Sequence, residues 1–319
     1  MRPLVATALA ALLAGTAHGA GSSGSRSRIA FGLERNGTSS IYTVRPDGSG
    51  LRRLTVPPTR QQLGGDSGPV WSPSGRRIVF ERDLTYWGAD RYHLAAVPAA
   101  GGLTRQLTNG PYDAMPTFSP NGRRIAFVRG GATVSLYTID RLGRHAAPLL
   151  SDGLDVSPTW SPDGQTIAFS RLADLSLPID QAALYLADAD GSHVRALGQA
   201  PVLGVSPAWS PDGKKLAFVS FADHNDPACP ADSCPPSGEI YVVNADGTRL
   251  TRLTASTADD EHPTWSPDGS RLAFASGFAL AGQGHPSWLV TIPAGGGSAT
   301  RIGRFSGVLD PDWSPAGVR

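Results

Sequence analysis

The chain has 319 residues, of which 40% are hydrophobic and 17% are charged, a balance that suits a globular protein with a sizeable core and excludes a disordered chain. Its formal net charge is +1, so the bulk charge gives no reason to expect nucleic acid or an anionic membrane as a partner. The 38 glycines and 27 prolines are scattered, which favours many turns between short strands.

The first 20 residues have the pattern of a secretory signal peptide. Arg2 precedes an apolar run at residues 4–14, and small residues follow at 17–20. The run is too short to span a membrane as a mature helix, and no cysteine follows it to carry a lipid anchor. We therefore expect residues 1–20 to be removed on export. Residues 21–319 are then expected in the periplasm or outside the cell, without membrane insertion.

One sequence pattern recurs along residues 21–319. An apolar stretch ends in Trp or Phe, a turn of the form S-P-x-G follows, and a second apolar stretch ends in A-F or V-F. Proline fixes φ for such a turn and glycine accepts a positive φ, so each copy is predicted to form a β-hairpin. Five complete copies lie at residues 68–80, 115–127, 157–169, 206–218 and 262–274.

Each hairpin is followed by two more predicted strands. A glycine turn such as D-A-D-G-S separates the third strand from a short fourth strand such as L-T-R-L-T at 250–254. The third strands are predicted at residues 41–44, 92–97, 135–139, 183–187, 239–243 and 288–292. Four short strands per unit, with aromatic markers 42 to 56 residues apart, indicate the blades of a β-propeller.

A sixth copy is split between the two ends of the chain. Its first strand lies at residues 310–315, and the matching second strand, S-R-I-A-F, lies at 27–31. Pairing between 310–315 and 28–31 would remove two open sheet edges and hold both termini. We therefore predict an all-β fold, a six-bladed β-propeller of four-stranded antiparallel blades whose ring is closed by pairing of the N- and C-terminal strands.

Several of these segments resemble a known repeat. P-T-W-S-P-D-G, L-A-F and E-I-Y-V-V-N-A-D-G-T-R-L-T-R-L-T are similar to the TolB-type propeller repeat, found in the C-terminal domain of TolB and in the propellers of prolyl oligopeptidase relatives. The resemblance covers nearly all of residues 21–319 and implies the fold more specifically than the function. Two features of these families have no counterpart here: the α/β domain before the TolB propeller, and the G-x-S-x-G motif of the peptidases.

Loop lengths predict which face of the propeller binds a partner. In a four-stranded blade, the turns between strands one and two and between strands three and four share one face, and here they are uniformly tight. The opposite face receives longer loops at residues 81–91, 171–181, 221–238 and 276–286. Variable loops on a rigid scaffold usually carry the function, so we expect the long-loop face to bind.

An acidic residue recurs on that face, three residues before the proline that opens a blade. These residues are Asp66, Asp113, Asp155 and Asp260. They would form a partial ring of carboxylates around the mouth of the central channel, available to a cation, a polyol or a basic side chain of a partner. Alternatively, each aspartate accepts hydrogen bonds from backbone N–H groups in its own loop.

Histidines and cysteines of the long-loop segments add further candidates. His93, His224, His262 and His285 fall in or next to these segments, and His262 joins the aspartates as a predicted binding residue. A metal site built from His224, His262 and His285 would resemble that of propeller lyases acting on acidic sugars. No two of these histidines share a short metal-ligand spacing, so we predict no cofactor and keep the metal site as the alternative.

Cys229 and Cys234 are the only cysteines. In an oxidising compartment they are predicted to close a small loop as a disulfide. The alternatives are two unpaired thiols or a weak metal pair.

The sequence favours a binding module over an enzyme. The string G-D-S-G-P at 65–69 resembles the nucleophile loop of trypsin-like proteases, but the position of Ser67 is held by Ala114, Val156 and Glu261 in other copies. No catalytic residue is therefore predicted. We expect an exported, monomeric, non-enzymatic scaffold that binds a protein or cell-envelope partner through the long-loop face and the channel mouth. The alternative is a secreted glycan lyase or hydrolase with a metal, His and Asp site at that mouth.

Overall fold

The computed structural model describes residues 27–56, 65–84, 92–131, 133–174, 181–222, 237–256, 258–277 and 287–317. These ranges contain strands and turns and no α-helix, as the predicted all-β class requires. No helix in the described ranges is long and apolar enough to cross a membrane. The predicted signal peptide, Cys229, Cys234, His224 and His285 lie outside the described residues.

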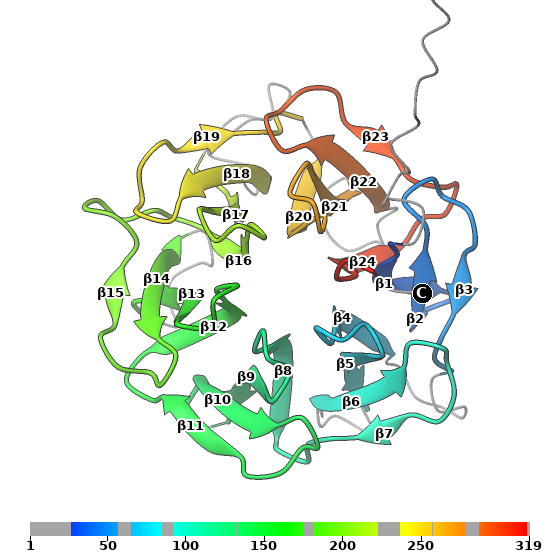
Figure 1. The fold of residues 1–319 in the computed structure, drawn as a ribbon, viewed down its shortest axis with the longest axis horizontal. Coiled ribbons are helices and arrows are strands. Elements are labelled where there is room, and N and C mark those ends of the chain that lie inside the picture. Colours follow the sequence, from blue (N-terminus) through cyan, green and yellow to red (C-terminus); the bar gives the residue numbers. More distant parts are fainter. Residues whose placement is uncertain are drawn as a thin grey trace, which may run out of the picture.

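Antiparallel sheets stand around a central axis like the blades of a propeller (Figure 1). One four-stranded sheet comprises β24 (Val308–Trp313), β1 (Ile29–Arg35), β2 (Thr38–Val44) and β3 (Arg52–Arg53). Three more comprise β12 (Leu154–Trp160), β13 (Thr166–Leu172), β14 (Ala183–Asp188) and β15 (Arg195–Ala196); β16 (Val205–Trp209), β17 (Lys215–Ser220), β18 (Glu239–Asn244) and β19 (Thr251–Arg252); and β20 (Asp259–Trp265), β21 (Arg271–Gly277), β22 (Trp288–Pro293) and β23 (Thr300–Arg301).

The remaining eight strands form two units of the same kind. They are β4 (Asp66–Trp71), β5 (Arg77–Asp83), β6 (Tyr92–Pro98) and β7 (Arg105–Gln106), and then β8 (Tyr112–Phe118), β9 (Arg124–Gly130), β10 (Ser135–Asp140) and β11 (Ala147–Leu150). A single parallel bridge between Tyr92 and Tyr112 joins these units into one eight-stranded sheet. Within each unit the strands pair antiparallel in chain order.

The two ends of the described chain lie side by side. β1 pairs antiparallel with β24, with Ile29 opposite Trp313 and Gly32 opposite Leu309. The backbone N–H of Ser314 donates to the carbonyl oxygen of Arg28 at 2.8 Å, and Ser314 Oγ accepts from the N–H of Arg28 at 2.9 Å. The first strand of this sheet is thus supplied by the C-terminal segment.

The core lies between neighbouring sheets. Trp71, which ends the innermost strand of one sheet, packs in one buried cluster with Ala30 and Ile41 of the adjacent sheet. The second strand of each unit contributes one phenylalanine that is at most 1% exposed: Phe31, Phe80, Phe127, Phe169, Phe218 and Phe274. Burying such a ring stabilises the fold by about 2–3 kcal/mol.

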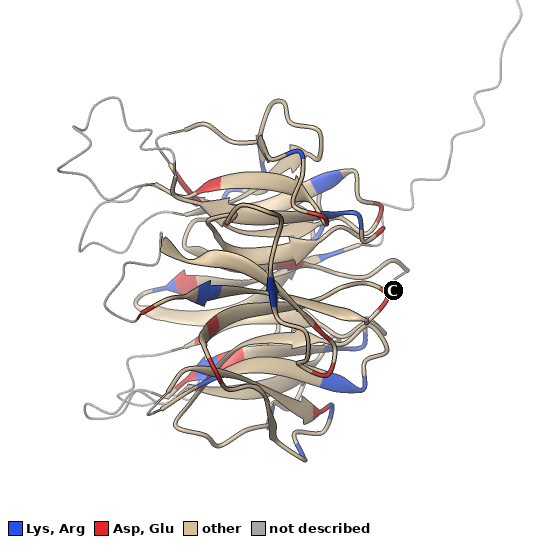
Figure 2. Ribbon diagram, turned by 90° about the vertical axis from the view of Figure 1, so that its left-hand side faces the viewer, with Lys and Arg blue, Asp and Glu red and all other residues tan. Residues whose placement is uncertain are grey.

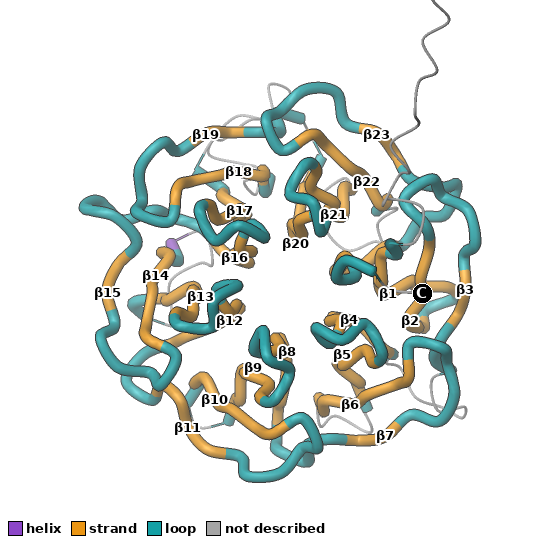
Figure 3. Tube along the Cα trace, viewed as in Figure 1, coloured by secondary structure: helices purple, strands orange, loops and turns teal. Residues whose placement is uncertain are grey.

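The S-P-x-G turns are held by their own side chains. In the turn at 161–166, Ser161 Oγ donates to Asp163 Oδ1 at 2.6 Å, and the N–H of Thr166 donates to Ser161 Oγ at 2.9 Å. Gly164 has a φ of 72°, which L side chains rarely adopt. These turns gather on one face of the molecule (Figure 3), which we call the tight-turn face.

Candidate functional site

The candidate site is the central channel, which is lined by the innermost strand of each unit (Figure 1). In each of these inner strands, two consecutive residues stand opposite one residue of the second strand, which is the pattern of a β-bulge. In β4, for example, Ser67 pairs with Glu81 and Val70 pairs with Val79, so Gly68 and Pro69 both stand opposite Phe80. The buried phenylalanine of each unit occupies the position opposite the bulge.

The first residue of each bulge has a left-handed backbone and precedes a proline. These residues are Gly68, Met115, Ser157, Ser206, His262 and Asp310, with φ between 45° and 54°. Only glycine adopts this region without cost, and five of the six are other residues. Bulges re-aim side chains, and strained backbone gathers at functional sites. We call these six the bulge ring.

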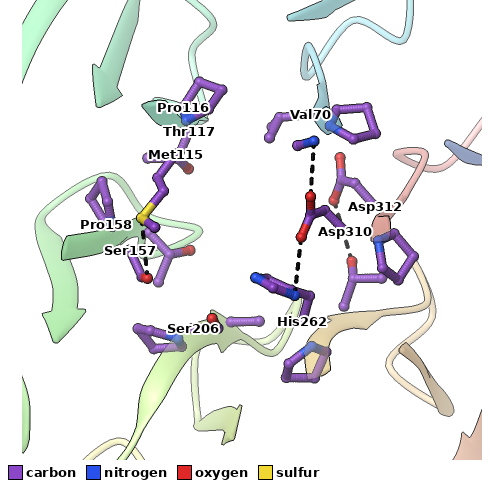
Figure 4. A pocket seen from close by; sticks show the side chains of 18 of the residues that line it. Val70, Met115, Pro116, Thr117, Ser157, Pro158, Ser206, His262, Asp310 and Asp312 are labelled. Atoms are coloured by element: carbon purple, nitrogen blue, oxygen red, sulfur yellow. Dashed lines mark hydrogen bonds and ion pairs between the residues drawn. The ribbon is translucent and has the colours of Figure 1, made fainter. Parts of the chain in front are cut away.

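The bulge ring surrounds a cavity of about 360 Å³. The close-up in Figure 4 shows Met115 and Ser157 on one side of it and His262 and Asp310 on the other. The prolines that follow the ring residues complete much of the wall. Apolar and polar groups therefore alternate around a preformed cavity, an arrangement that suits a ligand or an inserted side chain.

Glu81 reaches the cavity from a second strand. A Cβ at Gly68 would lie 2.6 Å from Glu81 Oε1, so the Glu81 side chain occupies the space that a ring side chain would fill there. Its Oε1 accepts a hydrogen bond from the N–H of Met115 at 2.7 Å. Burial and the nearby charge of Asp310 raise the pKa of Glu81 to about 7.

His262 and Asp310 form the charged centre of the ring. His262 Nδ1 lies 3.0 Å from Asp310 Oδ1, and their side chains are 41% and 28% exposed. Burial by itself would lower the pKa of His262, but the charges of Asp310, Glu261 and Glu81 outweigh it and raise that pKa from its usual value. The surrounding carboxyl groups thus stabilise the imidazolium form relative to that of a free histidine.

Carboxylates also link neighbouring inner strands across the channel wall. Asp310 Oδ2 accepts from the N–H of Gly68 at 3.1 Å, and Asp312 Oδ2 accepts from the N–H of Trp71 at 2.7 Å. Thr264 Oγ1 donates to Asp312 Oδ1 at 3.3 Å. Burial raises the pKa of Asp312 to about 7, against the opposing effect of these hydrogen bonds.

Three of the predicted aspartates are closed off from any ligand. Asp66, Asp113 and Asp155 have fully buried side chains. Arg129 donates to both carboxylate oxygens of Asp113, from Nε at 2.7 Å and from Nη2 at 2.9 Å. Arg82 binds Asp66 and Arg171 binds Asp155 in the same two-pronged way. An open ring of carboxylates is therefore the wrong interpretation for these three residues, which join the first strand to the second.

Asp260 differs from the other three. Ser276 lies opposite it, where Asp66, Asp113 and Asp155 each face an arginine, and Asp260 Oδ1 is buried without a hydrogen-bond partner in the described residues. Burial raises the pKa of Asp260 to about 7, and hydrogen bonds from Ser276 and Thr254 offset only part of that effect. Asp260 does not line the channel cavity.

The remaining candidates fall into two groups. His93 is buried in β6 and does not line the cavity, whereas His262 does. In the described ranges, no three His, Cys, Asp or Glu side chains are grouped to hold a metal ion. His224, His285, Cys229 and Cys234 are outside those ranges, so the alternative metal site and the disulfide stay predictions.

Sequence reasoning missed the residues that matter most in the channel. Asp310, Asp312, Met115 and Glu81 were not singled out, although three of them stand one residue before or after the repeated proline. Two sequence features point to Glu81. Glycine precedes the proline at 68–69, where the other copies carry a residue with a side chain, and Glu81 is a charged residue directly after I-V-F at 78–80.

Comparisons with known proteins identify the fold. No family model matches the chain. A segment of 80 residues, 25% of this chain, is 35% identical to the Tol-Pal system protein TolB of Alcanivorax borkumensis and spans 18% of that protein's length. TolB from Acinetobacter baumannii matches with a TM-score of 0.70 at 20% identity, covering 90% of this chain and 66% of that chain.

Two further solved structures are similar. The putative TolB from Agrobacterium tumefaciens matches with a TM-score of 0.65 at 19% identity, over 91% of this chain and 97% of that one. An oligogalacturonate lyase in complex with manganese matches with a TM-score of 0.50 at 16% identity, over 86% of this chain and 72% of that chain. The chain is therefore a TolB-like β-propeller, and the resemblance expected from the repeats is confirmed.

Proposed function

We propose that this chain is an exported, non-enzymatic binding scaffold of the cell envelope, and that its central channel and long-loop face recognise a protein or ligand partner. The observation that carries the proposal is the channel cavity of about 360 Å³, whose wall includes one left-handed residue of each inner strand, strained at the five positions that are not glycine. Such strain persists where the surrounding structure holds it, and it is common at binding sites.

The proposal includes a closed ring of six blades. The pairing of β1 with β24 supports closure, and the repeated bulge supports the count of six. A ring made this way has no free sheet edge at its seam, which suits a monomer. Its inner strands then present the bulge ring on a rigid frame, so binding requires little rearrangement.

The chemistry of the channel favours a basic group as the recognised element. Among the described residues, Glu81, Asp310 and Asp312 bring three carboxyl groups to the cavity, against the single imidazole of His262. A lysine or arginine side chain of a partner would compete with His262 for Asp310 and would gain the serine hydroxyls of the ring as further contacts. The side chain of Met115, 38% exposed, offers an adaptable apolar surface for the stem of such a side chain.

Capture from a cell-envelope extract tests the proposal. The wild-type chain, Asp310→Asn and His262→Ala are compared with Asp268→Asn, a control carboxylate on the tight-turn face that accepts a hydrogen bond from Ser266 Oγ at 2.6 Å. We expect the wild type and the control to capture a partner that the Asp310→Asn chain does not capture. Equal capture by all four chains, each shown to be folded by circular dichroism, would contradict recognition in the channel.

The enzymatic alternative rests on one observation, the pairing of His262 with Asp310 in the channel. As a glycan lyase or hydrolase, the chain would use this pair with a metal ion on an acidic sugar, the substrate class named for the manganese-bound lyase. Incubation with an oligogalacturonate and Mn²⁺ distinguishes the two functions. Cleavage that His262→Ala abolishes would replace the scaffold proposal with the enzymatic one.

A further inference from the structure

A basic patch lies on the tight-turn face, where the sequence predicted no site. Three S-P-x-G turns carry Asp163, Asp212 or Asp268 at the third position and the turn at 314–317 carries Ala316, whereas the turns at 72–77 and 119–124 carry Ser74 and Asn121. Each of these two turns continues with a pair of arginines. The patch comprises Arg76, Arg77, Arg123, Arg124 and Arg141; Figure 2 shows the molecule from the side, with the tight-turn face on the right.

The charges of the patch are not neutralised locally. Arg76, Arg123, Arg124 and Arg141 are exposed, and none of the five guanidinium groups forms an ion pair within the described part of the chain. Arg77 Nη1 donates to the carbonyl oxygen of Arg141 at 3.1 Å, which fixes one arginine between two adjacent units. The other positive charges are free to meet an anion.

The arginines border two hollows that lie next to each other. Arg76, Arg77 and Arg141 line a hollow of about 450 Å³, together with Pro73 and Phe118. No carboxylate of the described residues lines it. Arg123 and Arg124 line a second hollow of about 720 Å³ with Trp160 and Asp163, and Asn121 borders both. The patch thus combines arginine side chains with apolar groups that lie at the base of the two hollows.

We propose that this patch is a second binding surface, which takes an extended acidic peptide segment of a partner protein. Guanidinium groups bind carboxylates through paired, directional hydrogen bonds. The floor of Pro73 and Phe118 suits an apolar side chain between two acidic ones, which a peptide supplies and a phosphate polymer does not. Anionic ligands that are not protein segments, namely polyphosphate and anionic lipid, are therefore included in the test as alternative outcomes.

The chain contains a matched control. Lys214 and Lys215 occupy the positions of Arg123 and Arg124 in another turn and are also exposed. There Asp212 accepts hydrogen bonds from Ser210 Oγ at 2.7 Å and from the N–H of Lys214 at 3.1 Å. A double substitution at either pair removes two positive charges from the same face, but only one of the pairs belongs to the patch.

Fluorescence polarisation of a labelled synthetic peptide of alternating glutamate and leucine tests the proposal. We expect the full chain to bind it, and Arg123→Ala with Arg124→Ala to weaken binding roughly fivefold for each arginine removed. Lys214→Ala with Lys215→Ala should leave binding nearly unchanged, and added salt should weaken it. Polyphosphate and phosphatidylglycerol vesicles are tested in parallel.

Each outcome decides the proposal. Peptide binding that depends on the patch and not on the lysine pair supports it. Equal loss from both double substitutions would show non-specific attraction and overturn it. Absence of peptide binding, or stronger patch-dependent binding of polyphosphate or vesicles, would also overturn the assignment to an acidic peptide.

Discussion

Asp260 and Ser276 lie opposite each other in β20 and β21, at the position where the corresponding residues of other sheets, such as Asp113 and Arg129, form a buried ion pair. The consequence is a carboxyl group that is only 2% exposed and whose pKa burial raises to about 7. The molecule therefore contains the same buried aspartate position both with and without an arginine partner.

Ser276→Arg is expected to stabilise the protein at pH 8. The introduced guanidinium would reach Asp260 as Arg129 reaches Asp113, and it would stack over Phe274 as Arg129 stacks over Phe127 at 5.2 Å. We expect the free energy of unfolding at pH 8, measured by urea denaturation, to rise by about 1–3 kcal/mol. Ser276→Gln, long but neutral, is the control. A gain no larger than that of the control would contradict the pairing.

Asp113→Asn is expected to destabilise the protein. It leaves Arg129 without its charged partner in a largely buried site, and breaking such a pair costs about 3 kcal/mol. Thermal and urea unfolding at pH 7 measure the loss. Asp152→Asn provides the control, because Asp152 is 72% exposed and lies 3.3 Å from Arg171; its loss should cost less than about 0.5 kcal/mol. Equal effects of the two substitutions would argue against a structural role for Asp113.

The fold could be predicted from the sequence because its signals are local and repeated. Each S-P-x-G turn specifies a hairpin by itself, and the aromatic spacing sets the length of each unit. The pairing of the chain ends was also predictable, since each end carries half of one copy and the observed register joins Ile29 to Trp313.

The site was harder to predict because it depends on contacts between strands. The aspartates were found, but their arginine partners stand at the far end of the next strand, always 16 residues later. That constant spacing is visible in the sequence, and it also identifies Ser276 as the exception. The bulge ring could not be foreseen, because a positive φ before proline at Met115 or His262 is imposed by the sheet and not by the residue type.

Glu81→Gln is expected to change how stability depends on pH. The folded-state pKa of Glu81 is about 7, above its usual 4.5, so the folded state holds this proton more tightly than the unfolded chain does. The resulting stability is complete below about pH 4.5 and is lost as the pH rises through 7. Glutamine resembles the protonated acid and does not titrate.

Urea denaturation at pH 5 and pH 8 measures this effect. Relative to the wild type, Glu81→Gln should gain about 1–2 kcal/mol on going from pH 5 to pH 8, a figure reduced for the partial exposure of the side chain. His262, Asp310 and Asp312 also face this cavity and are common to both chains, so they largely cancel in the difference. Parallel pH profiles for the two chains would contradict the raised pKa.

Gly68 and Ser157 allow the strain in the bulge ring to be measured in both directions. Both residues have a φ near 54°, but only glycine adopts it freely. Ser157→Gly should therefore stabilise the protein by about 0.5–1 kcal/mol, because it removes a strained side chain whose only described hydrogen bond goes to Met115 Sδ at 3.5 Å.

Gly68→Ala should do the opposite, and by more. Alanine at a φ of 54° is strained, and its Cβ would lie 2.6 Å from Glu81 Oε1, so Glu81 must move and weaken its hydrogen bond from the N–H of Met115. We expect a loss of about 1–3 kcal/mol in urea denaturation. Combining Gly68→Ala with Glu81→Ala separates the contact with Glu81 from the backbone strain. We expect the double substitution to recover the stability lost through the contact but not the stability lost through the strained backbone. Full recovery would mean that the left-handed backbone at this position costs nothing, and the bulge ring would then not be a strained element.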